Sequence, residues 1–387
     1  MAKPIIIDEV PYRHSVLRKY DLDFSNITYW WSDSCEENFF DRLKSLNLYK
    51  KFAEDMILND AYLILDFSQD PINIKDVENF YRKTVFRFFK KYKISWHRLI
   101  ILSPSPDNLF FDLAGYNYTV YVKPSKVTRP YKHIHYNNLF QYTKECYIDS
   151  DLCAKVDLKP TKHFLFMSYR DSIPRMLMNT FFHINNLVDD NYISHNRFKE
   201  QSALSTSSKL SLIRTIFKST KNFNFESFVK YGFLRQTLDD PSDKSEATHS
   251  YDLHRLYSSK TCFEIVAETC VAHNKLCITE KTFKPILSKS VFLLMGNPRS
   301  INLLKSLGFK TFSDIIDESY DNEEIFYKRF LMIFDEVKKL CSLDVTSLHK
   351  KLEAMNEIVE YNYNHFLSNT WNFNLFQNIQ LHMDTNK

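Results

Sequence analysis

Short apolar runs alternate with amphipathic stretches along most of the chain. Short apolar runs bounded by polar or turn-forming residues are typical of buried parallel strands. Strands are predicted at residues 61–65, 98–102, 118–122, 164–167, 191–194, 263–266, 275–278 and 291–295. Helices are predicted at residues 73–93 and 301–307, and from residue 322 onward. This alternation predicts an α/β fold with parallel sheets.

The most regular part of the pattern is residues 263–321. Glu268 follows one predicted strand and Glu280 follows the next, so each carboxylate is expected at the edge where open α/β sheets bind ligands. Thr279 is a good N-cap, which predicts that a helix begins at Glu280. Gly308 is expected to end the helix of residues 301–307, because glycine readily adopts the left-handed conformation found there.

A carboxylate and an amine at the start of a helix suit a ligand that carries both a ribose and a phosphate. Glu280 is placed to accept the hydroxyls of a ribose, and Lys281 lies beside helix N-terminal amides that suit a phosphate. The simpler interpretation is that Glu280 only favours the helix dipole while Lys281 is a solvated surface residue. Spacing alone leaves both interpretations open.

The sequence of this region resembles a known family. Phe263-Glu264, with Glu268-Thr269 after it, then Thr279-Glu280-Lys281 and an apolar strand ending at Gly296, is similar to the donor-binding half of α-1,3-fucosyltransferases. The segment of residues 304–321 is similar to fucosyltransferase-like proteins of phages and large viruses. Because Thr269 stands where the family has Asn-Ser, the resemblance leaves the identity of the sugar open.

The resemblance, which covers roughly residues 160–325, implies a GT-B fold, with two Rossmann-like domains facing a cleft. We therefore predict an N-terminal acceptor domain at residues 1–155 and a nucleotide-sugar donor domain at residues 156–345. The helices of residues 346–387 are implied to cross back and pack on the first domain. In the family, the Glu and Lys that match Glu280 and Lys281 bind the ribose and the phosphates.

Arginines follow the first predicted strand of the donor domain. Arg170 and Arg175 match the family's arginine positions approximately. Either guanidinium would clamp a diphosphate and stabilise the charge of the leaving group, and Arg170 is favoured because it comes first after the strand. The alternative is that one of them pairs with Asp171 or caps a helix.

A transferase needs a general base to activate the acceptor hydroxyl, and this base is expected in the first domain. Asp66 and Asp70 lie at or just after a predicted strand end, and Glu37 is a third candidate. Trp30 and Trp31 are expected to be buried against the first helix, the alternative being a platform for an acceptor sugar.

Several classes of protein are excluded or disfavoured by the residues present. Only four glycines occur, and none of them forms a glycine-rich phosphate loop, which argues against kinases, P-loop enzymes and dehydrogenases. The Asp-x-Asp segments at residues 21–23 and 149–151 follow no clear apolar strand, so we interpret them as turns. We therefore predict no metal and no cofactor beyond the nucleotide sugar as co-substrate.

Composition adds little to this picture. The net charge of +4 neither requires nor excludes a polyanionic partner. The seven cysteines are odd in number and scattered, which indicates reduced thiols. With neither a signal peptide nor a transmembrane run in the sequence, a cytoplasmic location is expected, in the host cytoplasm if the protein is viral.

The predicted function is transfer of a sugar from a nucleotide-sugar donor to a hydroxyl of a glycan or other acceptor. The resemblance implies that the transfer is inverting. Two alternatives stay open. One is a glycosyltransferase that modifies DNA bases, and the other is a non-catalytic module that binds glycan or nucleic acid through basic loops such as residues 123–135.

Overall fold

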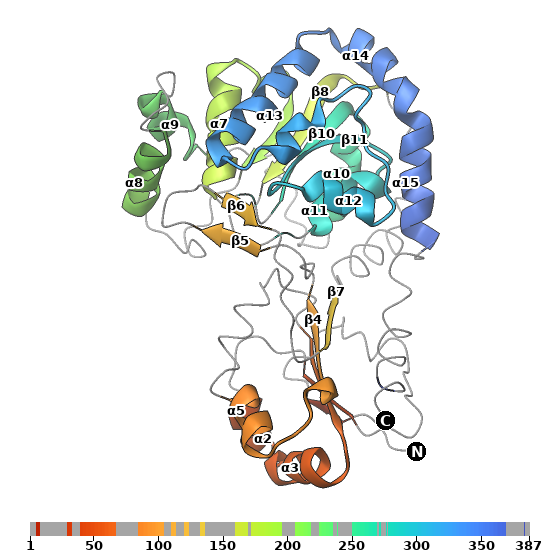
Figure 1. Ribbon diagram of the computed structural model, residues 1–387. Coiled ribbons are helices and arrows are strands. Elements are labelled where there is room, and N and C mark those ends of the chain that lie inside the picture. The colour runs from red at the N-terminus through yellow and green to blue at the C-terminus, as the bar shows by residue number, and fades with distance from the viewer. Residues whose placement is uncertain are drawn as a thin grey trace. The chain divides into compact units, whose positions relative to one another are not determined.

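The computed structural model describes residues 5–7, 29–32, 39–66, 84–103, 110–113, 120–123, 132–135, 159–168, 172–195, 206–217, 224–234, 238, 250–268, 271, 276, 278–368 and 383. The chain divides into two compact units, each with a parallel sheet and a core of its own (Figure 1). Unit 1 comprises Met1–Phe110, Pro124–Tyr142 and Asn369–Lys387. Unit 2 comprises Phe111–Lys123 and Thr143–Ser368.

Unit 1 is built on a five-stranded parallel sheet of order β1-β2-β3-β4-β7. The strands are β1 (Ile5–Ile7), β2 (Tyr29–Ser32), β3 (Tyr62–Asp66), β4 (Leu99–Ser103) and β7 (Lys132–His135). Spatial order follows chain order, so right-handed connections place the intervening helices on one face of the sheet. These elements are α2 (Phe39–Ser45), α3 (Tyr49–Leu58), α5 (Val85–Lys91) and the short η1 (Trp96–Arg98).

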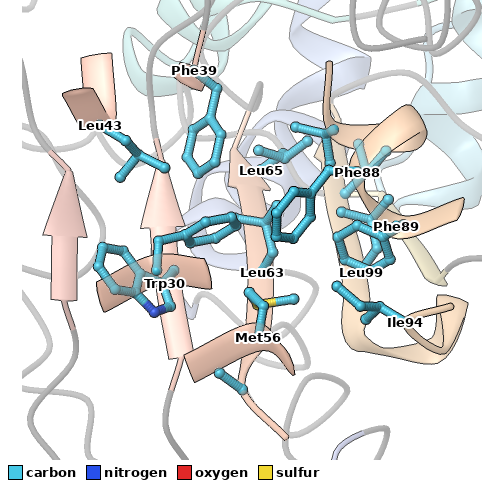
Figure 2. Packing of buried hydrophobic residues seen from close by; sticks show 14 residues of the cluster. Trp30, Phe39, Leu43, Met56, Leu63, Leu65, Phe88, Phe89, Ile94 and Leu99 are labelled. Carbon is cyan, nitrogen blue, oxygen red and sulfur yellow. The ribbon is translucent and has the colours of Figure 1, made fainter. Parts of the chain in front are cut away.

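The core of unit 1 lies between those helices and alternate residues of the strands (Figure 2). Leu63 and Leu65 of β3 point into the same cluster as the phenylalanines of the helices. Trp30 of β2 is fully buried, packs edge-on against Phe52, and donates its indole N–H to Asp55 Oδ2 at 3.1 Å. Burial with a satisfied N–H confirms that Trp30 is a core residue and not a surface platform.

The opposite face of this sheet is also buried. Tyr62 and Ile64 alternate with the core residues of β3 and are nearly inaccessible to solvent. The Tyr62 hydroxyl donates to the backbone oxygen of Met383 at 3.3 Å, and Met383 is itself fully buried. The end of the chain therefore contributes to the core of unit 1.

Unit 2 is built on a four-stranded parallel sheet of order β11-β10-β8-β9. The strands are β8 (Lys162–Ser168), β9 (Tyr192–His195), β10 (Thr261–Ala267) and β11 (Val291–Met295). The chain passes from β8 to β9 on one side, then returns past β8 to place β10 and β11 on the other. This order is that of a doubly wound, Rossmann-like sheet, with its switch point between β8 and β10.

Helices cover both faces of this second sheet. The helices are α7 (Ile173–Ile184), α8 (Thr206–Phe217), α9 (Phe225–Tyr231), α10 (Ser250–Ser258), α11 (Glu280–Leu287), α12 (Ser300–Ser306), α13 (Phe326–Cys341), α14 (Val345–Leu352) and α15 (Asn356–Ser368), with the short η4 (Glu318–Asn322) and η5 (Glu353–Met355). On one face α7 and α13 lie side by side, with the rings of Phe181 and Phe334 stacked at 3.8 Å (Figure 1). Right-handed connections place α10 and α11 on the other face, where they join through a 3.3 Å hydrogen bond between Ser288 Oγ and His254 Nδ1.

Most predicted strands are confirmed, and one is wrong. Of the helix predicted at residues 73–93, the structure describes residues 84–93, and only Val85–Lys91 are helical, as α5. Leu276 and Ile278 are buried as expected but lie outside any strand, because a short apolar run indicates burial without deciding the backbone conformation. The strand predicted at residues 118–122 corresponds to β6 (Val120–Lys123), which pairs with β5 (Phe110–Leu113) outside both larger sheets. Among the described residues, no helix has the length and apolarity to cross a membrane.

Substitution of Gly308 tests how the end of α12 is built. Gly308 has φ +89°, and a Cβ atom there would lie 2.8 Å from His365 Nε2. We expect Gly308→Ala to lower the free energy of unfolding by about 2–4 kcal/mol, because left-handed strain and steric overlap add. Urea unfolding measures this loss.

His365→Ala serves as the partner in a double-mutant cycle. Removing the imidazole relieves the overlap but not the backbone strain, so the double variant should lose less than the sum of the two single variants. If the losses of the two single variants simply added in the double variant, the contact with His365 would make no contribution to the loss caused by Gly308→Ala.

Candidate functional site

The carboxyl ends of the strands in unit 2 form the edge where a ligand is expected. In open α/β sheets, ligands bind outside the carboxyl ends at the switch point, where successive loops diverge. Here the switch point lies between Ser168, the last residue of β8, and Ala267, the last residue of β10. The residues that follow β10 and β11 are therefore the ones to examine.

Glu268 lies directly after β10 and is almost fully buried. Its carboxylate accepts hydrogen bonds from the backbone N–H of Thr279 at 2.9 Å, and from the hydroxyls of Thr279 and Thr282 at 2.5 Å each. All three donors belong to the N-cap and first turn of α11. We infer that Glu268 anchors the start of α11 from behind rather than facing a ligand.

Glu280 and Lys281 occupy the first turn of α11, as predicted. Lys281 Nζ donates to Glu280 Oε1 at 2.5 Å, and the two side chains are 29% and 25% exposed respectively, so this pair is accessible to a ligand. Burial opposes ionisation of Glu280, but the charge and hydrogen bond of Lys281 and the charge of Lys284 hold its pKa below the usual value. The site thus presents an ionised carboxylate and an amine at the positive end of a helix.

The two arginines predicted for this site have different outcomes. Arg175, in the first turn of α7, is buried and donates from Nη2 to the backbone oxygen of Ala267 at 3.1 Å. It therefore joins the start of α7 to the end of β10 across the switch point. Arg170, the favoured residue, lies outside the described residues.

A further pair of buried charges holds the neighbouring loops, and sequence analysis missed both. Arg329 of α13 donates to the backbone oxygens of Glu323 at 2.8 Å and Val271 at 2.7 Å, so it fixes the segment between β10 and α11. Asp321 accepts from the backbone N–H groups of Ile301 and Asn302 at 3.0 and 3.1 Å, and so caps α12.

Burial dominates the ionisation of both groups. It raises the pKa of Asp321 to about 6, against the opposing effect of the two backbone hydrogen bonds and the charge of Arg329. It also lowers the pKa of Arg329 to about 10. Arg329 contacts Val271 and Asp321 contacts Ile301, and neither contact follows from a local sequence pattern, so no motif indicated these two residues.

The predicted general bases can be located only in part. Asp66 is the last residue of β3, at the carboxyl edge of the sheet in unit 1, where it was expected. Asp70 and Glu37 lie outside the described residues. Within the described part of the chain, no cluster of His, Cys, Asp and Glu side chains has the arrangement of a metal site.

No family model, curated protein or solved structure matches this chain. The resemblance to fucosyltransferases therefore stays a prediction, and the geometry of the site carries the functional argument.

Removing the Glu268 carboxylate should show how strongly it anchors α11. We expect Glu268→Ala to lower the free energy of unfolding by about 3 kcal/mol or more, because three buried donors lose their acceptor. Glu268→Gln keeps one acceptor oxygen and should lose less. Chemical unfolding of both variants provides the measurement, and a loss for the alanine variant no larger than that of a surface substitution would contradict the anchoring role.

Asp321 predicts a pH dependence of stability. Its folded pKa of about 6 exceeds the value of about 3.9 expected in the unfolded chain, so folding favours the protonated carboxyl. The resulting stabilisation is fully present below about pH 4 and is lost as the pH rises through 6. Relative to Asp321→Asn, the wild type should lose about 2–3 kcal/mol between pH 4 and pH 7.

Unfolding of both proteins across this pH range isolates the effect, because the other titrating groups are common to both. A constant difference between wild type and variant would contradict the assignment.

Proposed function

We propose that the protein is a glycosyltransferase that uses a nucleotide-sugar donor, and that unit 2 binds this donor. The observation that carries the proposal is the pair Glu280–Lys281, partly exposed in the first turn of α11 and held at the carboxyl edge of a sheet with a switch point. A nucleotide needs an acceptor for its ribose hydroxyls and a cation for its phosphates. This pair offers both groups side by side.

In the proposed complex, Glu280 accepts hydrogen bonds from the ribose and Lys281 contacts the diphosphate. The depressed pKa of Glu280 supports this role, because an ionised carboxylate is the stronger acceptor. Lys281 and the positive end of α11 would stabilise the negative charge that develops on the departing diphosphate. The anchoring of α11 by Glu268 supports a site that is formed before the ligand binds.

The proposed reaction is a single displacement that inverts the anomeric carbon. The acceptor oxygen forms a bond to that carbon while the bond to the diphosphate oxygen breaks, and a carboxylate takes the hydroxyl proton. Asp66, Asp70 and Glu37 are the proposed bases, and metal independence is part of the proposal. The acceptor is a hydroxyl compound, either a glycan or another molecule.

A two-domain arrangement of the GT-B type belongs to the same proposal. The presence of two α/β units, each built on a parallel sheet, supports this arrangement. The burial of Met383 in unit 1 also supports it, since the end of the chain returns there after the second unit is complete.

The test is release of nucleoside diphosphate from a panel of nucleotide sugars, which detects transfer to water when the acceptor is unknown. We expect Lys281→Ala to lower kcat/KM about 30- to 1000-fold, corresponding to about 2–4 kcal/mol of lost transition-state stabilisation. Lys351→Ala is the matched control, because it removes an exposed lysine from α14 of the same unit. Equal turnover by wild type and Lys281→Ala would overturn the proposed donor site.

A further inference from the structure

Arg299 has an unusual backbone conformation for its position. It has φ 69° and ψ 15°, in the left-handed region that is unfavourable for residues with a Cβ atom. Six residues other than glycine have positive φ in the described part of the chain. Five of them, Asn47, Asp60, Lys93, Asn186 and Lys289, directly follow the C-terminal cap of a helix, where this conformation is common.

Arg299 differs from these five because it precedes a helix and follows the carboxyl end of a strand. Its backbone N–H donates to the backbone oxygen of Asp321 at 2.7 Å, which fixes the strained conformation. Strain that the surrounding structure maintains is often found at ligand-binding sites. The side chain held in this way is a guanidinium.

The turn that carries Arg299 lies next to the anchor of α11. At Gly296 the chain comes so close to Ser300 that a Cβ atom would overlap it, and the same Cβ would lie 4.0 Å from Glu268 Cγ. Glu268 in turn binds the cap and first turn of α11, where Lys281 is found. Arg299 and Lys281 thus extend from two segments that both contact Glu268.

The charge of Arg299 is available at this edge. Its side chain is partly exposed, and within the described part of the chain it makes no ion pair or side-chain hydrogen bond. The carboxylate of nearby Asp321 is occupied by the backbone N–H groups of α12. A partly buried guanidinium with no carboxylate partner suits an anion that binds from solution, because it can donate two parallel hydrogen bonds to phosphate oxygens.

We propose that Arg299 is a second phosphate-binding residue, which contacts the diphosphate of the donor together with Lys281; this inference rests on the proposed function. Two cations from neighbouring loops hold the two phosphates from different directions. The strained turn places Arg299 between β11 and α12, in the segment that approaches Glu268.

The decisive variant is Arg299→Gly, which removes the guanidinium and also relieves the backbone strain, since glycine adopts positive φ readily. Its affinity for nucleoside diphosphates, measured by titration calorimetry against ADP, GDP, UDP and CDP, should fall about 10-fold or more. Its unfolding temperature should stay at or above that of the wild type. A purely structural role for Arg299 would instead lower the unfolding temperature and leave the affinity unchanged.

Arg299→Lys keeps the charge without the planar fork and should lose only part of the affinity. Lys351→Ala, in α14, is the charge-matched control and should bind as the wild type does. Inorganic pyrophosphate is titrated alongside, because it tests the anion contacts without the nucleoside.

The outcomes separate the two proposals. Diphosphate binding that weakens in Lys281→Ala and in Arg299→Gly supports both. Binding that weakens only in Lys281→Ala overturns the role of Arg299 and leaves the donor site standing. If no nucleotide binds but pyrophosphate binds and depends on Arg299, the proposed function fails while the anion contact stands; if neither binds, both fail.

Discussion

The buried carboxylate of Glu268 is the interaction on which the candidate site depends. A carboxyl group taken out of water is costly unless its oxygens are hydrogen-bonded, and Glu268 meets this requirement with three donors from the start of α11. The requirement acts in both directions. Glu268 is satisfied in its buried position by the start of α11, and the start of α11 is held by its hydrogen bonds to Glu268. The orientation of Glu280 and Lys281 follows from this constraint.

The same principle recurs around the carboxyl edge of the second sheet. Arg175, Asp321 and Arg329 are all buried, and each forms hydrogen bonds with main-chain atoms of another segment. Arg175 binds the end of β10, Asp321 binds the start of α12, and Arg329 binds the loop between β10 and α11. A charged side chain that binds backbone groups fixes the path of the main chain more directly than a hydrogen bond between two side chains would. Loops held in this way present their exposed residues in a defined geometry before a ligand arrives, which reduces the entropy lost on binding. Burying Glu268, Arg175, Asp321 and Arg329 lowers the stability of the unit unless their hydrogen bonds compensate. Together these four side chains fix the carboxyl edge of the sheet.

Sequence reasoning was most successful where local physics decides the outcome. The strands at residues 61–65, 164–167 and 291–295 were found because short apolar runs bounded by polar residues are typical of buried parallel strands. The cap at Thr279 was found because its side chain accepts a backbone N–H within its own turn. It was less successful where contacts with distant parts of the chain decide how a side chain or the backbone is placed. Glu268 was expected at a ligand site because it follows a strand, but only the packing of α11 shows that its carboxylate faces inward. Nothing in the sequence indicated the left-handed backbone of Arg299, since the position holds neither glycine nor asparagine, the residues that commonly adopt it.

The burial of Met383 has a consequence for synthesis of the protein. The strands of unit 1 follow one another in chain order, so each can add beside its predecessor as the chain emerges from the ribosome. The contact between Tyr62 and Met383 joins residues 321 positions apart, and it can form only after all of unit 2 has been translated. The unit that is synthesised first is therefore completed last, and until then one face of its sheet lacks part of its cover.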